Sequence, residues 1–568
     1  MNPTSVFFER LVSEKILTKE DSSRLADKYK SDISSVWDYI LHGNFCKKEV
    51  LGKLWGDSIG VSYVDLNKTL FQSQIVSKLP EQFARRNRVI PIYKMGDVVT
   101  VAAATPTDQE MLKKAETAIG SSISAVFSFP ADIDDAIEIQ YQTRDSINEF
   151  LDRIVDNELF KDTSKITYEE LQKLSGDQSI IDLCRGLLLL GVKDRASDIH
   201  IEPAEDSVRV RYRIDGVLQE RIMLEKALLP PLSSCLKVMA GLDITEKRRP
   251  QDGRINLHLT KKSIDFRLST IPTIYGEKIV LRILGQIQTD EIPDLNVLEL
   301  SKSNYTKTKR VIEIPNGVFF VTGPTGSGKT TTLFAVLNHL NTPEINIMTV
   351  EDPVEYRLPG INQIQVNPVI NLDFAAALRS FLRQDPDVIL IGEIRDLETA
   401  KIAAQAALTG HLVLATMHTN NALQAVTRLV EIGVEPFLVA PSIIGVMAQR
   451  LTRRICIYCK ERYQLSEKEI EQYFIWDKAT DVYFYKGKGC PECNNTGYFG
   501  RLAIQEVFIM SEEIRSLVAK GASILEIEKT AKKSGFKTMR YDGLKKVLRG
   551  LTTIDELERV AAVEEELH

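Results

Sequence analysis

Residues 323–330 read Gly-Pro-Thr-Gly-Ser-Gly-Lys-Thr and match the nucleotide-binding pattern GxxxxGK[ST] at every fixed position. The apolar run Val318–Val321 before them predicts a buried strand, and Thr330–Leu337 after them predicts a helix. This order presents backbone N–H groups to phosphate oxygens, with Lys329 reaching the β- and γ-phosphates and the Thr330 hydroxyl facing Mg²⁺. The sequence therefore predicts a nucleoside triphosphate site. Its expected residues are Gly323, Pro324, Thr325, Gly326, Ser327, Gly328, Lys329, Thr330 and Thr331.

The composition is that of an ordinary soluble protein. A chain of 568 residues is too long to fold around one hydrophobic core and suggests about three or four domains. Its 43% hydrophobic and 26% charged residues exclude a largely disordered chain, and a net charge of −6 argues against a general nucleic-acid binder. No run reaches the ~18 apolar residues of a membrane span, and Met1–Ser5 lacks the features of a signal peptide. We expect a cytoplasmic protein that meets the membrane through a partner.

The patterns along the chain divide it into four segments. Residues 1–140 are expected to form an N-terminal domain with helices and strands, and residues 141–178 a helical linker. Residues 179–300 are rich in alternating strands. Residues 301–568 follow an α/β pattern, with a cysteine module at 453–500 and short amphipathic helices at the end. In the first segment, helical patterns cover residues 5–15, 19–30 and 33–42.

Period-two alternation in the third segment brings arginines together. Val208–Ile214 and Ile264–Leu268 alternate apolar with charged residues, so each predicts a strand with one buried and one polar face. Arg213 and Arg267 lie on these polar faces. A solvated strand face is the alternative to a functional role.

Acidic residues end a strand downstream of the glycine loop. The run Ile347–Val350 leads into Glu351, Asp352 and, after a proline, Glu355. Strand ends in an open parallel sheet face the ligand crevice. We therefore expect Glu355 to polarise the attacking water, with Glu351 and Asp352 in support. The alternative is a solvated acidic turn.

Two further strand ends carry the remaining chemistry. The run Val388–Ile391 is followed by Gly392, at the usual aspartate position of P-loop enzymes, and then by Glu393, which we expect to act on Mg²⁺ through water. His418 comes at the end of another apolar strand and is expected to sense the γ-phosphate. His411, at the opposite end of that strand, is expected to be structural.

Four of the seven cysteines form two CxxC pairs, separated by 30 residues. In a cytoplasmic chain this spacing predicts a structural tetrathiolate zinc site rather than disulfides. Four reduced thiols or a lost metal are the alternatives. The expected ligands are Cys456, Cys459, Cys490 and Cys493.

Taken together, these segments resemble the secretion ATPase superfamily that powers type IV pili and type II secretion. Residues 385–396 read DPDVILIGEIRD and residues 409–420 read TGHLVLATMHTN, close to the Walker B and histidine boxes of that family. The resemblance covers residues 180–568 strongly and the N-terminus weakly. Further matching segments are residues 196–203, 211–216, 249–254 and 266–270, the cysteine quartet, Gly500-Arg501 and Asp542-Gly543.

The resemblance implies an α/β fold with a RecA-like P-loop motor domain. A PAS-like α+β N2 domain and an N1-type α+β domain would precede the motor, which would carry the tetracysteine zinc module. Family members are homohexamers in which arginines of the N2 domain complete the nucleotide site, and cationic side chains stabilise a transferring phosphoryl group. The matching candidates are Arg213 and Arg267, with Arg211, Arg254 and Arg282 beside them.

The implied function is ATP hydrolysis, with Mg²⁺, that powers type IV pilus assembly. The ring would act at the cytoplasmic face of the inner membrane on a platform protein, peripheral to the membrane through its partners. A type II secretion ATPase that drives pseudopilus assembly and protein export is the alternative.

Two other classes of protein are alternatives to this function. A nucleic-acid motor would also combine a P-loop with a zinc knuckle and a basic cluster. Acidic overall charge and a lack of interleaved aromatic and basic residues weigh against it, so no nucleic acid is expected. A non-catalytic ring component is disfavoured because Lys329, Glu355 and Glu393 are intact. The basic cluster comprises Arg450, Arg453, Arg454, Lys460 and Arg462.

The N-terminal segment resembles the N1 domain of the family, some versions of which bind cyclic-di-GMP through paired RLGxxLVxxG motifs. The counterparts here, residues 9–16 and 35–43, have both lost the first glycine. We expect no cyclic-di-GMP binding, and a domain that docks on a membrane-associated partner.

Overall fold

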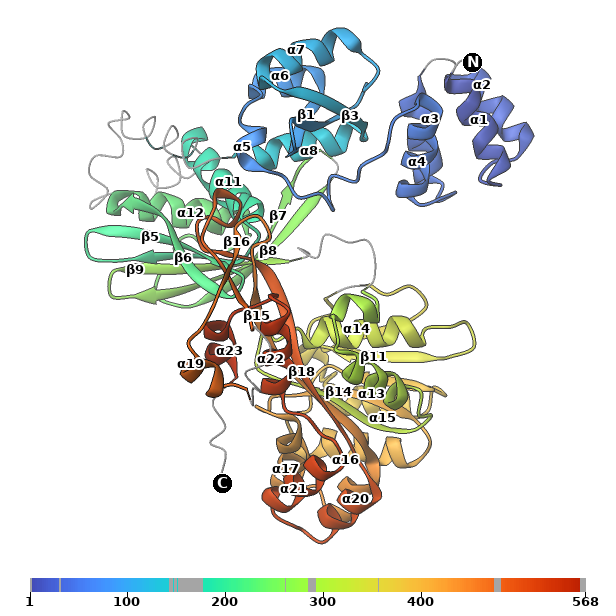
Figure 1. The fold of residues 1–568 in the computed structure, drawn as a ribbon, viewed down its shortest axis with the longest axis vertical. Coiled ribbons are helices and arrows are strands. Elements are labelled where there is room, and N and C mark those ends of the chain that lie inside the picture. Colours follow the sequence, from blue (N-terminus) through green and yellow to red (C-terminus); the bar gives the residue numbers. More distant parts are fainter. Residues whose placement is uncertain are drawn as a thin grey trace. The chain divides into compact units, whose positions relative to one another are not determined.

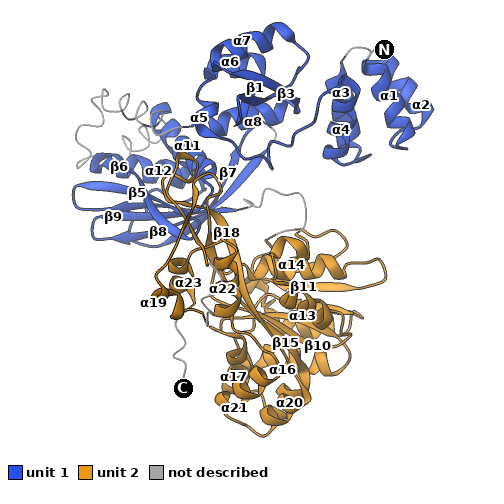
Figure 2. Cartoon of the chain, in the orientation of Figure 1, with its two compact units in different colours: residues 1–289 blue, residues 290–568 orange. Residues whose placement is uncertain are grey.

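The computed structural model describes residues 3–29, 32–142, 147, 151, 177–260, 262–284, 293–355, 357–474 and 482–561. The chain forms two compact units, residues 1–289 and 290–568 (Figure 2). The linker predicted at residues 141–178 lies almost wholly outside the described residues. None of the helices in the described part of the chain has the length and hydrophobicity that a membrane span requires.

Four helices open the first unit. Their apolar faces meet around Phe7, Trp37 and Trp55, and the two indole rings lie edge to face with centroids 5.5 Å apart. The helical patterns predicted in the first 42 residues are confirmed. The helices are α1 (Pro3–Ser13), α2 (Lys19–Tyr29), α3 (Ile33–His42) and α4 (Lys48–Ile59).

A three-stranded sheet follows, and helices pack around it (Figure 1). The middle strand runs antiparallel to the first and parallel to the third. The strands are β1 (Val89–Met95), β2 (Val98–Ala103) and β3 (Ser122–Phe127), and the helices are α5 (Ser73–Val76), α6 (Glu81–Asn87), α7 (Gln109–Ile119) and α8 (Pro130–Gln140).

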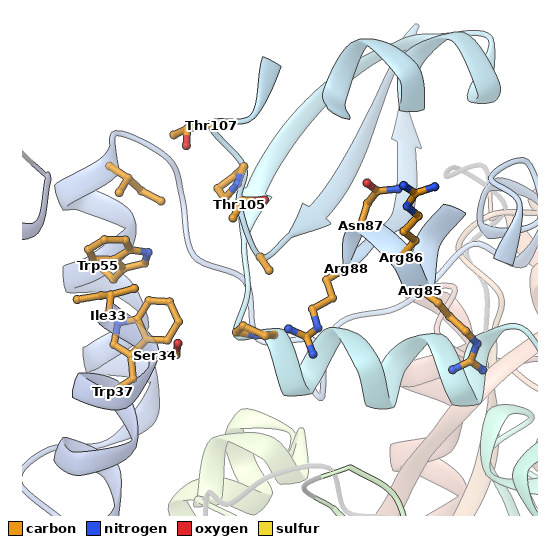
Figure 3. A pocket seen from close by; sticks show the side chains of 14 residues that line it. Ile33, Ser34, Trp37, Trp55, Arg85, Arg86, Asn87, Arg88, Thr105 and Thr107 are labelled. Atoms are coloured by element: carbon orange, nitrogen blue, oxygen red, sulfur yellow. The ribbon is translucent and has the colours of Figure 1, made fainter. Parts of the chain in front are cut away.

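A cavity of about 500 Å³ lies between α3 and α4 on one side and the end of α6 on the other. Trp37 and Trp55 line one wall, and Arg86 and Arg88 lie across from them (Figure 3). The Arg88 guanidinium already donates to the Asp134 carboxylate, with Nε and Oδ2 3.1 Å apart. This cavity belongs to the first unit, whereas the glycine loop belongs to the second.

Six antiparallel strands form the last part of the first unit, in the order β6-β5-β4-β9-β8-β7. Helices α11 (Gln178–Lys193) and α12 (Leu229–Met239) pack on the apolar face of this sheet. The strands predicted from period-two alternation are confirmed. The sheet consists of β4 (Ala196–Pro203), β5 (Ser207–Ile214), β6 (Val217–Glu225), β7 (Gln251–His258), β8 (Ser263–Thr273) and β9 (Gly276–Leu284).

A seven-stranded sheet forms the centre of the second unit, in the order β12-β11-β13-β14-β10-β15-β18. All neighbouring strands are parallel except the last pair, β15 and β18. The sheet consists of β10 (Gly317–Thr322), β11 (Ile347–Glu351), β12 (Asn362–Gln365), β13 (Val388–Ile391), β14 (Leu412–Met417), β15 (Ile443–Ile455) and β18 (Tyr498–Ile509).

Helices cover this sheet, and several of them begin at a polar cap directly after a strand or loop. Asp396 accepts from the Thr399 backbone N–H at 2.8 Å, and Asn421 accepts from that of Gln424 at 2.9 Å, which starts a helix after each functional strand end. The helices are α13 (Lys302–Ile312), α14 (Lys329–Leu340), α15 (Phe374–Phe381), α16 (Leu397–Leu408), α17 (Ala422–Ile432) and α18 (Pro436–Ser442).

The C-terminal helices attach to the sheet through β18. The buried Glu506 carboxylate accepts from the backbone N–H groups of Ala422 (2.6 Å) and Met539 (2.7 Å), so one anion caps the first turns of both α17 and α22. The short helices predicted after the cysteine module are confirmed as α20 (Glu512–Ala519), α21 (Ile524–Lys533), α22 (Met539–Leu548) and α23 (Ile554–Val560).

A second buried glutamate fastens α23 to β15. Glu556 is 1% exposed and accepts from the backbone and guanidinium N–H groups of Arg453 and from Arg559. Burial alone would raise the pKa of Glu556, but these hydrogen bonds lower it to about 2.

Glu556→Gln is expected to destabilise the second unit by on the order of 1–3 kcal/mol at pH 7. Because the folded pKa of about 2 lies below the ordinary value of 4.5, the stabilisation is full above pH 4.5 and is lost as the pH falls toward 2. Calorimetric unfolding of the full chain at pH 7 and pH 4 should therefore show the largest difference between the two proteins at pH 7. Exposed Glu513→Gln is the control, and a difference that does not change with pH contradicts this prediction.

Candidate functional site

The glycine loop leaves a completely buried strand at the centre of the sheet. All six residues of β10 are buried, and Gly323 and Gly328 have φ angles of 146° and 86°. A Cβ at Gly323 would lie 2.4 Å from the Gln449 carbonyl oxygen, so only glycine fits there. The predicted strand, loop and helix are confirmed as β10, residues 323–328 and α14.

Lys329 lies at the first position of α14. Its ammonium donates to the carbonyl oxygens of Gly323 (2.8 Å) and Pro324 (3.0 Å) in the same loop. Burial lowers the pKa of Lys329 below its ordinary value, and the nearby Glu393 carboxylate offsets only part of this shift. The backbone amides, the lysine and the helix start form a set of donors that fits a nucleotide phosphate.

Glu393 and His418 lie together at the ends of neighbouring strands. The His418 Nε2 and Glu393 Oε1 atoms are 3.0 Å apart, and Arg395 Nε donates to Glu393 Oε2 at 2.6 Å. Thr416 donates to the Gly392 carbonyl oxygen at 2.6 Å, which holds the two strand ends side by side. The structure therefore brings the predicted residues Lys329, Glu393 and His418 into one site.

The other predicted acids form a second group at the end of β11. Glu351 is 5% exposed and accepts from the Thr349 hydroxyl (2.6 Å) and the Gln363 amide (3.0 Å). Burial raises its pKa, and the carboxylate of exposed Glu355 adds to this effect. Glu351 is thus held in place by its neighbours, whereas Glu355 is open to solvent.

His411 has the structural role expected for it. Its Nδ1 lies 2.9 Å from the Ala406 carbonyl oxygen and 3.3 Å from the Thr409 hydroxyl, at the start of β14. These contacts close the turn between α16 and β14, at the end of the strand away from His418.

Four of the five candidate arginines lie in one cross-strand row on the six-stranded sheet of the first unit, whereas Arg211 pairs in register with His200 and forms an ion pair with Glu202 at 2.8 Å. Asp198 pairs in register with Arg213 on one side and Arg282 on the other, and the row continues through Arg267 and Arg254. Asp198 forms ion pairs with Arg213 at 3.5 Å and with Arg282 at 2.9 Å. Arg267 is exposed.

The four paired cysteines converge. All four sulfur atoms lie within 4.8 Å of one another. The Sγ distances are 3.8 Å for Cys456 and Cys490, 3.9 Å for Cys459 and Cys493, and 3.6 Å for Cys490 and Cys493. A tetrahedron with Zn–S bonds of ~2.3 Å separates its sulfurs by ~3.8 Å, so this set fits a zinc ion.

Members of the basic cluster are engaged in contacts within the second unit. Arg453 pairs with Glu556 and stacks over the Tyr498 ring at 4.0 Å. Arg454 pairs with Glu299, and Arg450 donates to Asn420. Lys460 and Arg462 on β16 (Lys460–Tyr463) lie over the rings of Tyr485, on β17 (Phe484–Gly487), and of Tyr483, directly before β17.

Gln449 belongs to the site, although its place in the sequence did not predict this. Gln449 on β15 is 1% exposed, and its amide nitrogen donates to the Ser327 carbonyl oxygen of the glycine loop at 2.8 Å. The only signal in the sequence is a polar residue at the end of the apolar run Ile443–Ala448.

Gly323→Ala is expected to weaken nucleotide binding by about tenfold or more, because the new methyl group would collide with the Gln449 backbone and push the loop outward. Gly326→Ala is the matched control: it also has a positive φ, 77°, but nothing lies within 4 Å of its Cβ position. Titration with a fluorescent ADP analogue measures both affinities. Equal losses in the two variants would contradict the prediction.

Known proteins that are similar to this chain include ATPases. The family described as Type II/IV secretion system protein matches residues 173–559, and the MshEN domain matches residues 59–147. The type IV pilus assembly ATPase PilB of Myxococcus xanthus is 38% identical over 97% of both chains. The type II secretion system protein E of Xanthomonas campestris is 43% identical over 85% of both chains.

Two further similar proteins match a smaller share of one of the two chains. The Thermus thermophilus pilus assembly ATPase PilB is 40% identical over 92% of this chain, which spans 58% of the length of that relative. The solved structure of the pilus retraction motor PilT with bound ADP is 26% identical and covers 66% of this chain and 96% of its own, with a TM-score of 0.45. The family match covers well over half of this chain, and the P-loop site is present. The chain therefore belongs to the type II/IV secretion system protein family and is one of its ATPases.

Proposed function

We propose that this ATPase works as a homohexamer that powers type IV pilus assembly from the cytoplasmic side of the inner membrane, through a platform protein. The observation that carries the proposal is the group formed by Lys329, Glu393 and His418 at the ends of adjacent parallel strands. Relatives named as pilus assembly ATPases match nearly the whole chain.

Type II secretion is the second candidate. Relatives named as type II secretion proteins are up to 48% identical and match 69–86% of this chain, whereas the pilus assembly relatives match 92–97% of it. Deletion of the gene decides between the two functions. Loss of surface pili with normal export supports the first candidate, and loss of an exported protein with normal pili supports the second.

In the proposed reaction the glycine loop and Lys329 would bind the β- and γ-phosphates, the Thr330 hydroxyl would hold Mg²⁺, and Thr331 would contribute to the nucleotide site. The metal ion would neutralise charge that develops on the transferred phosphoryl group. Glu393, held by Arg395 and His418, would orient the water molecules around it.

Glu355 is the proposed residue that polarises the attacking water. Its carboxylate is exposed to solvent, where it can accept a hydrogen bond from a water molecule. The buried Glu351 beside it, held by Thr349 and Gln363, would fix the end of β11 from which Glu355 extends.

The six-stranded sheet of the first unit is proposed to belong to a PAS-like N2 domain, whose arginines would complete the nucleotide site. Arg213 and Arg267 are the first candidates, since they lie in the same cross-strand row. Asp198 orients Arg213, whereas exposed Arg267 is available to an anionic phosphate.

Lys329→Ala is expected to reduce ATP turnover at least about a hundredfold, because it removes the cation that contacts the β- and γ-phosphates. Glu355→Gln is expected to reduce kcat by a similar factor while the KM for ATP stays within about threefold. Phosphate release from the purified full chain measures both, with exposed Lys520→Ala as the control. Unchanged turnover in Lys329→Ala would refute a catalytic role for this site.

The tetracysteine cluster is proposed to hold one structural Zn²⁺ per chain. Backbone N–H groups of Cys490 and Gly497 donate to Cys493 Sγ, both at 3.2 Å, as expected around a metal-bound thiolate. The four ligands would close the coordination sphere and leave no position for a substrate.

Replacing Cys459 and Cys493 by serine is expected to abolish zinc binding and to expose residues 450–500 to hydrogen exchange, because the metal supplies folding free energy to this module. Mass spectrometry of the metal content and of deuterium uptake tests this. Cys46→Ser is the control and should retain one zinc ion per chain. Full stability of a protein with all four cysteines changed to serine would exclude the zinc site.

A further inference from the structure

We propose that Gln449 is a positioning residue for ATP hydrolysis, which holds the glycine loop in the shape that binds phosphate. The inference rests on the ATPase function of the site and adds a residue that the known loop pattern does not contain. Gln449 lies on β15, about 120 residues beyond the loop that it contacts.

The amide nitrogen and the amide oxygen of Gln449 both form hydrogen bonds, one to a residue before Lys329 and one to a residue after it. Its Nε2 donates to the Ser327 carbonyl oxygen at 2.8 Å, and its Oε1 accepts from the Thr332 hydroxyl at 2.7 Å. Ser327 lies in the loop and Thr332 in the first turn of α14. One rigid planar group therefore fixes the distance between the loop and the helix that follows it.

The main chain of Gln449 forms a support for the same loop. A Cβ at Gly323 would lie 2.4 Å from the Gln449 carbonyl oxygen, and a Cβ at Gly328 would lie 3.1 Å from its Nε2. The first and last glycines of the loop thus both pack directly on this residue. The strand pairing between β10 and β15 ends at Thr322 and Ala448, so Gln449 continues the contact where the loop leaves the sheet.

The chemistry of the contact selects glutamine. The Ser327 carbonyl needs a donor and the Thr332 hydroxyl needs an acceptor, and a primary amide supplies both in one plane. A carboxylate at this position would lose the donor and place a buried negative charge behind a phosphate site. A methionine would keep the volume but leave the buried Ser327 carbonyl without this partner.

Gln505 provides a matched control. It lies directly opposite Gln449 on β18 and is equally buried, at 0% exposed. Its amide nitrogen donates to the Leu298 carbonyl oxygen at 3.2 Å, and its oxygen accepts from Lys546 at 3.0 Å. Gln505→Met therefore measures the stability that is lost with a buried glutamine of this sheet, while the contacts of Ser327 and Thr332 stay unchanged.

The test compares Gln449→Met, Gln449→Glu and Gln505→Met in the full-length protein. Affinity for fluorescent ADP, kcat and KM for ATP, and Tm are measured for each. We expect Gln449→Met to weaken ADP binding and to raise the KM about tenfold, the size of one lost buried hydrogen bond, and Gln449→Glu to weaken binding further. Gln505→Met should lower Tm but change ADP affinity less than about twofold.

Thr332→Val serves if the Gln449 variants fail to fold, because it removes only the hydroxyl that orients the amide. It should weaken ADP binding about threefold. Wild-type affinity in Gln449→Met, or in Thr332→Val where the former does not fold, overturns the inference. If the wild-type protein itself binds no nucleotide, the proposed function fails instead, so the two failures are distinguishable.

Discussion

The parallel pairing of β10 with β14 on one side and β15 on the other is the constraint on which the site depends. Parallel strands in register end at the same edge of the sheet. The register pairs Thr322 with both Met417 and Ala448, so Gly323 and His418 leave the sheet beside Gln449, where β15 continues along β18. The glycine loop therefore lies between a histidine and an amide that come from distant parts of the chain.

The same edge explains how the acids are distributed. β13 pairs with β14, so Glu393 comes out beside His418, and β11 pairs with β13, so Glu351 lies one strand farther away. Glu393 is close enough to Lys329 to affect its pKa, whereas Glu351 is held by side chains on β11 and β12. Two carboxylates that look alike in the sequence thus occupy different environments.

Buried carboxylates connect the sheet to the C-terminal helices. Glu506 caps α17 and α22 together, and Glu556 holds Arg453 of β15 and Arg559 of α23. A buried anion is stable only where such donors surround it. These contacts link the helix that follows His418 to helices more than 100 residues later in the chain.

The sequence by itself determined the local features of this protein. A loop of glycines that ends in Lys329, strands and helices with the right period, and two CxxC pairs each depend on residues close together in the chain, so their patterns could be recognised. His411 at a strand start could also be assigned. A short turn brings the two sulfurs of one CxxC pair together, whereas the meeting of the two pairs is a contact across 34 residues, and the metal between them is still a prediction.

Only the tertiary structure decided which distant residues share a site. Gln449 is an ordinary glutamine in the sequence, and its role exists because β15 pairs with β10. His418 next to Glu393, Glu506 between two helices, and the tyrosines under the basic cluster depend in the same way on strand order and register. These are long-range contacts, which no local period encodes. The physical reason is that a parallel sheet gathers strand ends by their order in space and not by their order in the chain.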